Sequence, residues 1–225
     1  MICFAKIPIV PPGSIAAELA CYPSSWQSHF NTLHYRGEWT VLPLRTPAGK
    51  DSIVPDLMGE QIYANTTHMQ HFPSVDLLIR SLNCPVQSVR FLNLKAGADI
   101  KPHRDHELAF EKGEARLHFP IVTNPEVEFW VEDIRLNMQP GECWYINANL
   151  THRVSNKGNT DRVHLVIDCL VNDWLHELFG HADKQTKADE VDTEKQKQVI
   201  AALRLQNTTT ATQLADQLER ELRIS

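Results

Sequence analysis

The feature that most restricts the fold is a series of short segments with alternating apolar residues in the middle of the chain. The predicted strands are Val89–Leu94, Arg116–Val122, Val127–Val131, Glu142–Ile146 and Val163–Leu170. The turn signals between them are Ala96–Asp99, Met138–Gly141 and Asn156–Asn159. Short strands divided by such turns are typical of an antiparallel sandwich or barrel. The sequence therefore predicts a mainly β core.

The N-terminal part of the chain predicts two helices and one further strand. Ser14 is expected to cap a helix that ends near Cys21, and Ser74 to cap one that ends near Leu82. Between the helices, residues 39–45 alternate like a strand. The two faces of this strand carry Trp39, Val41 and Arg45 on one side and Thr40, Leu42 and Leu44 on the other.

The composition changes after Gly180. Residues 181–197 are rich in charged residues and Gln and poor in apolar ones, which predicts a linker or a solvated helix. Two helical patterns follow, at Glu194–Leu205 and Thr210–Leu222. We therefore expect a β domain over residues 1–180 and a polar linker with a C-terminal helical extension over residues 181–225. These helices can pack on the β domain, pair with another subunit or dock a partner.

The charge balance and the cysteines limit the partners and the compartment. Lys and Arg number 22 against 28 Asp and Glu, so the formal net charge is -6. A mildly acidic chain has no general attraction for nucleic acid or anionic membranes. No apolar run is long enough to span a bilayer, and the N-terminus does not look like a signal peptide. The five cysteines form no CxxC pair, which favours reduced thiols in a cytoplasmic protein.

One cluster of residue types predicts a metal site. His103 and Asp105 follow a strand and turn, and residues two apart on an extended backbone point the same way. His152, in a later segment, would complete a set of two histidines and one carboxylate. That set leaves open positions on the metal and suits iron(II) oxygen chemistry. His181 and Asp183 have the same spacing, but no histidine follows them, so we expect no metal there.

Three arginines and a histidine on predicted strands are candidate anion ligands. Arg162 opens an apolar strand and could hold a distal carboxylate of 2-oxoglutarate, or it could be a surface cation. Arg116 and His118 share one strand face, which lines a cavity or faces solvent. Arg90 raises the same question, because an arginine inside a strand is costly to bury without an anion.

The order of these motifs resembles the aspartyl/asparaginyl β-hydroxylase family. The resemblance covers roughly residues 89–170, and it is strongest to a bacterial branch that includes proline hydroxylases. Members of that branch share the Pro-His-Arg-Asp form seen at Pro102–Asp105 and a Gly-x-Trp segment ahead of an arginine, here Gly37–Trp39 and Arg45. Vertebrate members resemble this chain less, because they have glycine where this sequence has Asp105.

The resemblance implies a fold, a set of cofactors and a role for each candidate residue. The fold would be a double-stranded β-helix, the jelly-roll or cupin-like architecture, and the cofactors would be Fe(II), 2-oxoglutarate and O2. The implied metal ligands are His103, Asp105 and His152. The implied 2-oxoglutarate ligands are Arg162 and His118, and the implied substrate ligands are Arg90, Arg116 and Trp39.

Several functions remain open at this stage. The first is hydroxylation of a free amino acid or similar small acid, because paired arginines suit a free carboxylate. The second is hydroxylation of an Asp, Asn or other residue in a peptide or protein. The third is a non-catalytic cupin-like metal-binding module. Another oxidation of the same class, such as desaturation, is the fourth.

Overall fold

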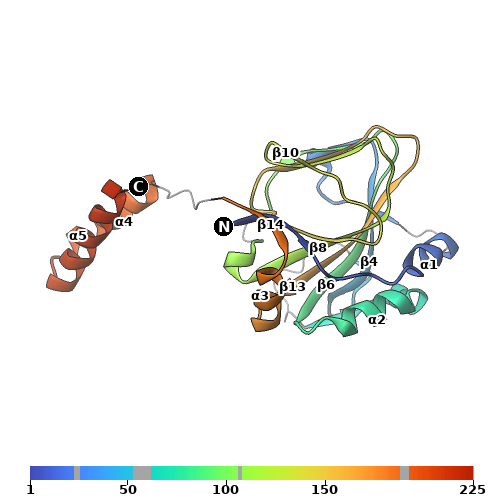
Figure 1. Ribbon diagram of the computed structural model, residues 1–225, viewed down its shortest axis with the longest axis horizontal. Coiled ribbons are helices and arrows are strands. Elements are labelled where there is room, and N and C mark those ends of the chain that lie inside the picture. The colour runs from blue at the N-terminus through green and yellow to red at the C-terminus, as the bar shows by residue number, and fades with distance from the viewer. Residues whose placement is uncertain (23–25, 53–61, 106–107, 188–192, 225) are drawn as a thin grey trace. The chain divides into compact units, whose positions relative to one another are not determined.

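Two antiparallel sheets build the larger part of the protein (Figure 1). The computed structural model describes residues 1–22, 26–52, 62–105, 108–187 and 193–224. The described chain divides into two compact units. One contains Ile2–Thr186, and the other contains Met1 with Lys187–Ser225.

The larger sheet has nine strands, and all its neighbouring strands run antiparallel. Its order is β14 (Asp183–Thr186), β1 (Ile2–Ile7), β11 (Cys143–Ile146), β8 (Glu114–Val122), β13 (Arg162–Leu170), β6 (Val86–Leu94), β4 (Trp39–Pro47) and β2 (Gln27–Ser28). β5 (Tyr63–Asn65) pairs with the far end of β4. The smaller sheet has the order β10 (Ile134–Leu136), β9 (Val127–Val131), β12 (His152–Asn156), β7 (Asp99–His103) and β3 (Tyr35–Arg36).

The path of the chain identifies the architecture. From β6 to β9 each successive strand changes sheet, and so does each strand from β11 to β13. Alternation between two facing antiparallel sheets is the topology of a jelly roll, or double-stranded β-helix. The predicted fold class is therefore confirmed, including the helices at both ends of the chain.

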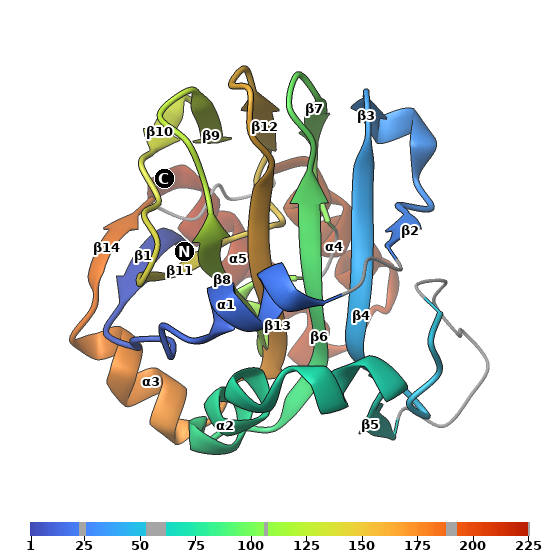
Figure 2. The same ribbon diagram turned by 90° about the vertical axis from the view of Figure 1, so that its right-hand side faces the viewer.

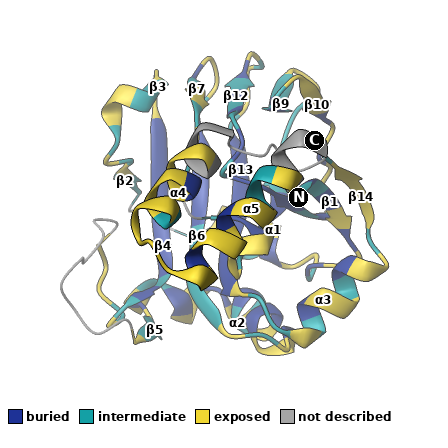
Figure 3. Cartoon of the chain, turned by 90° about the vertical axis from the view of Figure 1, so that its left-hand side faces the viewer, coloured by how far each residue is buried: buried dark blue, intermediate teal, exposed yellow. Residues whose placement is uncertain are grey.

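Helices cover the outer face of the larger sheet and form the main core with it (Figure 2). They are α1 (Ile15–Cys21), α2 (Pro73–Ser81) and α3 (Asp173–Gly180). Short 3-10 turns lie at Thr32–His34, Thr67–His71 and Phe110–Lys112, and the first of them contacts β7 of the smaller sheet. Figure 3 shows the buried residues concentrated on β4, β6 and β13. Leu42 and Leu44 of β4 are fully buried in this core, whereas Trp39, Val41 and Arg45 line a cavity on the other face. The predicted division of this strand into two faces is confirmed.

Three local predictions were wrong. Ser14 occupies the N-cap position of α1, but its side chain makes no capping hydrogen bond. Ser74 does not cap α2, because the helix already begins at Pro73, and the Ser74 backbone N–H donates to the Glu18 carboxylate. The segment after Gly180 is not only linker or helix, because Asp183–Thr186 forms β14 against β1. All four residues of β14 are exposed, so the strand has no apolar alternation to reveal it. Residues 188–192 of the predicted linker lie outside the described residues.

The smaller unit is a helical hairpin. α4 (Thr193–Leu205) and α5 (Thr209–Ile224) match the two predicted C-terminal helices to within two residues at each end. Ile200, Ala211 and Ala215 are buried, and Arg204 pairs with Asp216 at 2.7 Å. The division into domains at residue 180 stays a prediction, as does the cytoplasmic location. No helix in the described part of the chain has the length and apolar composition needed to cross a bilayer.

Candidate active site

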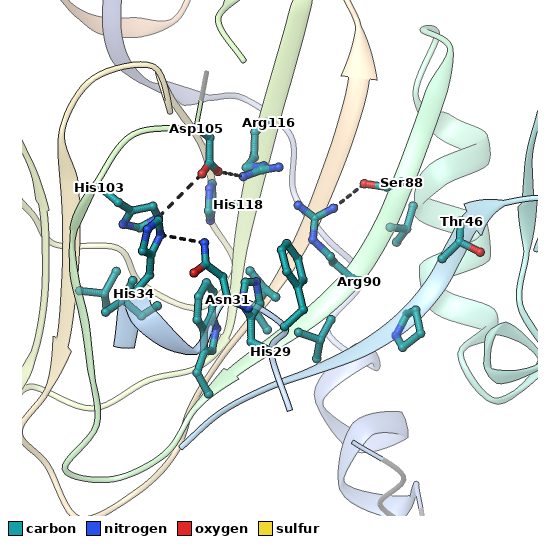
Figure 4. A pocket seen from close by; sticks show the side chains of 18 of the residues that line it. His29, Asn31, His34, Thr46, Ser88, Arg90, His103, Asp105, Arg116 and His118 are labelled. Atoms are coloured by element: carbon teal, nitrogen blue, oxygen red, sulfur yellow. Dashed lines mark hydrogen bonds and ion pairs between the residues drawn. The ribbon is translucent and has the colours of Figure 1, made fainter. Parts of the chain in front are cut away.

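Backbone pairing brings the three predicted metal ligands together on the smaller sheet. His103 ends β7, His152 begins β12, and the two residues are direct partners in the register of these strands. Their ring centroids lie 4.2 Å apart. Asp105 follows His103 by two residues, and its carboxylate lies 3.9 Å from His103 Nε2 (Figure 4). One ligand atom from each residue falls within 4.8 Å of the others.

Hydrogen bonds orient both imidazoles for metal binding. His103 Nδ1 donates to the Lys101 carbonyl at 2.8 Å, and His152 Nδ1 donates to the Leu150 carbonyl at 3.0 Å. This arrangement leaves each Nε2 free to face Asp105. Burial, followed by the neighbouring His103, lowers the pKa of His152 to about 4. His152 is therefore neutral near pH 7, as a metal ligand must be.

Within the described residues, the competing His-x-Asp motif belongs to no group with metal-ligand spacing. His181 follows the last turn of α3, and Asp183 begins β14. Among the residues that the structure describes, the His103, Asp105 and His152 group is the only His, Cys, Asp or Glu cluster with metal-ligand spacing.

Arg162 is buried and has no anionic partner among the described residues. Only 2% of the residue is exposed, and its guanidinium lies 5.5 Å from the Phe129 ring centroid. One terminal nitrogen donates to His164 Nδ1 at 2.8 Å, while Nε has no partner. Within the described ranges no carboxylate pairs with this side chain, and burial lowers the pKa of the guanidinium. Because a buried charge without a counter-ion is costly, this geometry favours a site for an added anion.

His118 is a second polar side chain without a partner in the same cavity. It is 5% exposed, and neither ring nitrogen makes a hydrogen bond. Burial, followed by the charge on Arg162, lowers the pKa of His118 well below its ordinary value. A neutral imidazole offers one N–H donor and one acceptor, so His118 can donate to a bound carboxylate.

Arg90 and Arg116 share a buried carboxylate, Asp168. Arg116 Nε and one terminal nitrogen donate to Asp168 at 2.7 and 3.1 Å, and Arg90 donates to it at 2.9 Å. The other terminal nitrogen of Arg116 donates to Asp105. Burial would raise the pKa of Asp168, but Arg116 and then Arg90 hold it well below its ordinary value. The structure thus identifies the interior cations that partner Asp168.

Trp39 forms one wall of the cavity with residues that the sequence did not reveal. Its ring stacks on His29, with the centroids 3.6 Å apart and 11° between the planes. His34 lies 5.3 Å from His103, ring to ring, and accepts a hydrogen bond from Asn31 (Figure 4). These residues belong to the short strands and turns of residues 27–35, which have no periodic pattern. In the sequence, only the presence of His29 and His34 could have pointed to this part of the cavity.

All eight predicted site residues line a single cavity of about 480 Å³. The metal ligands and Arg162 contribute from several strands, and Arg90, Arg116 and Trp39 line the same space. The cavity therefore combines a candidate metal centre, buried donors with no described partner and an aromatic wall.

Comparisons with known proteins agree with this arrangement. The family model described as aspartyl/asparaginyl beta-hydroxylase matches residues 14–171. An L-proline cis-4-hydroxylase of Rhizobium meliloti (strain 1021) is 30% identical over 165 residues, which cover 71% of this chain and 58% of that protein. L-proline cis-3-hydroxylase 2 of a Streptomyces species is 29% identical over 138 residues, which cover 59% of this chain and 47% of the relative.

The chain spans about half the length of the curated relatives it matches. The family match nevertheless covers most of the jelly-roll unit and every candidate ligand. The chain therefore belongs to the aspartyl/asparaginyl β-hydroxylase family.

Proposed function

We propose that the protein is an Fe(II)- and 2-oxoglutarate-dependent dioxygenase that hydroxylates a C–H bond of a free amino acid or similar small carboxylic acid. The observation that carries this proposal is the pairing of two features in one cavity. One is the His103, Asp105 and His152 cluster, and the other is the buried, anion-free guanidinium of Arg162.

The cluster has the donor set that Fe(II) requires. Two imidazoles and one carboxylate, with ligand atoms within 4.8 Å of one another, are a donor set that would hold Fe(II) and leave it open to further ligands. Bound Fe(II) would supply the oxidising chemistry by which O2 and 2-oxoglutarate turn R–H into R–OH, with succinate and CO2 as coproducts. His103 and His152 would hold the metal through Nε2, because their Nδ1 atoms are already engaged with backbone carbonyls.

Arg162 and His118 fit the carboxylate groups of 2-oxoglutarate. Arg162 presents unpaired guanidinium donors to the cavity, and its planar fork matches a carboxylate. His118 can donate from a ring nitrogen that has no other partner. His164 holds Arg162 in place by accepting its hydrogen bond, so the guanidinium is oriented before the anion arrives.

The substrate end of the cavity fits a small amino acid. Arg90 lies on the cavity wall, where one of its terminal nitrogens donates to Asp168, the carboxylate that Arg116 also binds. Trp39 and its stacked partner His29 provide a flat surface for an apolar side chain or ring. The relatives are named for hydroxylation of L-proline, which supports an amino acid of this size as the substrate.

Succinate formation across a substrate panel tests the proposal. The protein would be assayed with Fe(II), ascorbate and 2-oxoglutarate against the twenty free amino acids and several Asp- and Asn-containing peptides. We expect one or a few free amino acids to stimulate succinate formation and to gain one oxygen atom by mass. Asp105→Asn should lose this activity, and Asp183→Asn, in the competing motif, should retain it.

Other outcomes of this assay would each support a different function. Stimulation by peptides alone would support a peptide or protein substrate. Loss of two hydrogens from the substrate, without gain of oxygen, would indicate desaturation. Metal binding without any succinate from the panel would contradict the proposal and favour a non-catalytic metal-binding module.

A further inference from the structure

Asp168 lies where strand pairing brings two arginines of the cavity together. On β13 it is the direct partner of Arg116 on β8, and Val166, two residues earlier on the same face, is the partner of Arg90 on β6. Only 9% of Asp168 is exposed. Its two oxygens accept hydrogen bonds from both guanidiniums and from the Ser88 hydroxyl, so the carboxylate is fully engaged.

Arg116 connects Asp168 to the metal cluster. Three of its nitrogens face carboxylates: Nε and one terminal nitrogen face Asp168, and the other terminal nitrogen faces Asp105 Oδ2. The second oxygen of Asp105, Oδ1, is the one that lies 3.9 Å from His103 Nε2. Arg116 thus holds one oxygen of Asp105, and the other is left for a metal. Two fixed hydrogen bonds to Asp168 set the plane of the guanidinium that does this.

We propose that Asp168 is a positioning residue that couples the metal ligand Asp105 to the substrate-facing Arg90. This inference rests on the proposed function, which identifies the metal as Fe(II) and the substrate as a small amino acid. Through Arg116, Asp168 fixes the orientation of Asp105 before the metal binds. Through its direct hydrogen bond, the same carboxylate fixes Arg90 on the cavity wall. Arg116 accordingly acts on the metal ligand, and Arg90 is the arginine that contacts the substrate.

A purely structural ion pair would behave differently from a positioning residue. A structural role requires only that Asp168 neutralises two buried arginines, so its loss would lower stability and leave the metal affinity of the folded protein unchanged. A positioning role requires that metal affinity changes in the folded protein. Outer hydrogen-bond partners of metal ligands typically contribute about 10-fold to 100-fold in affinity.

The test is a titration of metal-free protein with Mn(II), without 2-oxoglutarate or substrate, in which free Mn(II) is followed by electron paramagnetic resonance. We expect Asp168→Asn to weaken Mn(II) binding by about 10-fold or more. Asp76→Asn, which removes an aspartate from the Arg80 ion pair on α2, is the matched control and should retain wild-type affinity. Wild-type affinity in folded Asp168→Asn would overturn the inference.

A second variant keeps the test decisive if Asp168→Asn folds poorly. Asp168→Glu retains the negative charge for both arginines, but the added methylene displaces the carboxylate and rotates Arg116. We expect a smaller but measurable loss of Mn(II) affinity in Asp168→Glu, and an unchanged affinity would contradict the proposal.

Variants of Arg116 and Arg90 test the two parts of the proposed coupling separately. Arg116→Gln should weaken Mn(II) binding as much as Asp168→Asn, and the double variant should lose no more than either one alone. Arg90→Gln should retain Mn(II) affinity and instead raise the KM for the amino acid that stimulates succinate formation. Additive losses in the double variant would show that Asp168 does not act through Arg116. Failure of the wild-type protein to bind Mn(II) or to form succinate would refute the proposed function instead.

Discussion

Arg162 shows how burial decides between two roles that the sequence leaves equal. At the start of a strand, an arginine can be a surface cation or an anion ligand. In the structure the residue is 2% exposed, lies against Phe129 and has no carboxylate partner among the described residues. A surface cation would be hydrated, so the anion-ligand role is the one that the environment of Arg162 supports.

The metal ligands can be tested by histidine variants with a control inside the same chain. His103→Ala and His152→Ala each remove one of the three proposed ligands, so both should lose high-affinity Fe(II) binding and succinate formation. His181→Ala removes the histidine of the competing motif, which joins no metal cluster in the described structure, and should behave like the wild-type protein. Isothermal titration with Co(II) under anaerobic conditions measures the affinity. Unimpaired binding in either ligand variant would refute the assignment of that residue.

The buried histidines predict a loss of stability in mild acid. Burial lowers the pKa of His118, His152 and His164 below the ordinary 6.5, so the folded state resists protonation while the unfolded state accepts it. The free energy of unfolding is therefore highest above about pH 6.5, where these histidines are neutral in both states, and it decreases as the pH falls below that value. Each histidine contributes about 1.4 kcal/mol per pH unit, or about 4 kcal/mol in all at about pH 5.5.

Urea unfolding of the metal-free protein at about pH 7.5 and pH 5.5 measures this effect. His152→Asn should reduce the pH dependence by about one proton, and His181→Asn should leave it unchanged. Equal free energies of unfolding at the two pH values in the wild-type protein would contradict the buried, neutral state of these side chains.

Among the elements, most strands with a buried face were predictable, but β1 was missed although Cys3, Ala5 and Ile7 on one of its faces are buried. β6, β8, β9, β11 and β13 alternate or are continuously apolar, and each was predicted to within about three residues. β14 is exposed at every position, and β7 carries exposed residues beside the proposed metal ligand His103, so neither has an apolar pattern. β12 does alternate between buried and half-buried residues, but polar side chains occupy most of its positions.

The sequence was enough to predict several residues of the candidate site, but not which of them contact one another. His103, Asp105 and His152 could be assembled from spacing and chemistry. The link between Asp168 and Arg116 depends on which residues face each other across β13 and β8. This register cannot be predicted from the sequence of either strand alone. The contribution of His29 and His34 depends on a short segment whose conformation is set by tertiary contacts.

The turn before β4 provides a test at the scale of elements. Gly37 has φ +78°, and a Cβ there would lie 2.8 Å from the Cβ of the buried Ala98. Gly97 has φ +76°, but nothing lies within 4 Å of its Cβ position. Gly37→Ala combines backbone strain with a clash and should cost about 2–4 kcal/mol, whereas Gly97→Ala should cost about 1–2 kcal/mol of strain alone. Urea unfolding of the two variants measures the difference.

The clash at Gly37 also bears on the site, because Trp39 begins β4 two residues later. We expect Gly37→Ala to raise the KM for the amino-acid substrate in the folded fraction, since a displaced turn moves Trp39 and the stacked His29. Equal stabilities of the two glycine variants would show that the approach to Ala98 does not constrain this turn.

On the scale of the whole molecule, every candidate ligand belongs to the jelly-roll unit. The proposed metal ligands, Arg162, His118 and the proposed substrate-binding residues all lie within Ile2–Thr186. The helical hairpin of α4 and α5 contributes no described residue to the cavity.

This division predicts that the C-terminal unit is dispensable for the chemistry. A chain shortened to residues 1–186 should fold, bind Fe(II) and form succinate at a rate within about two-fold of the full chain. Circular dichroism and the succinate assay measure both properties. A shortened chain that folds and binds metal but forms no succinate would show that α4 and α5 take part in substrate binding or turnover.

The most direct measurement of the central claim is an anaerobic titration of the Fe(II)-loaded protein with 2-oxoglutarate, followed by the visible charge-transfer absorption of the iron complex. We predict that the absorption appears and saturates in the wild-type protein. In Arg162→Ala it should require at least about 30-fold more 2-oxoglutarate, because a buried charge-assisted pair contributes about 2 kcal/mol or more. No absorption in the wild-type protein, or the same midpoint in Arg162→Ala, would contradict a metal centre and a 2-oxoglutarate site in this cavity.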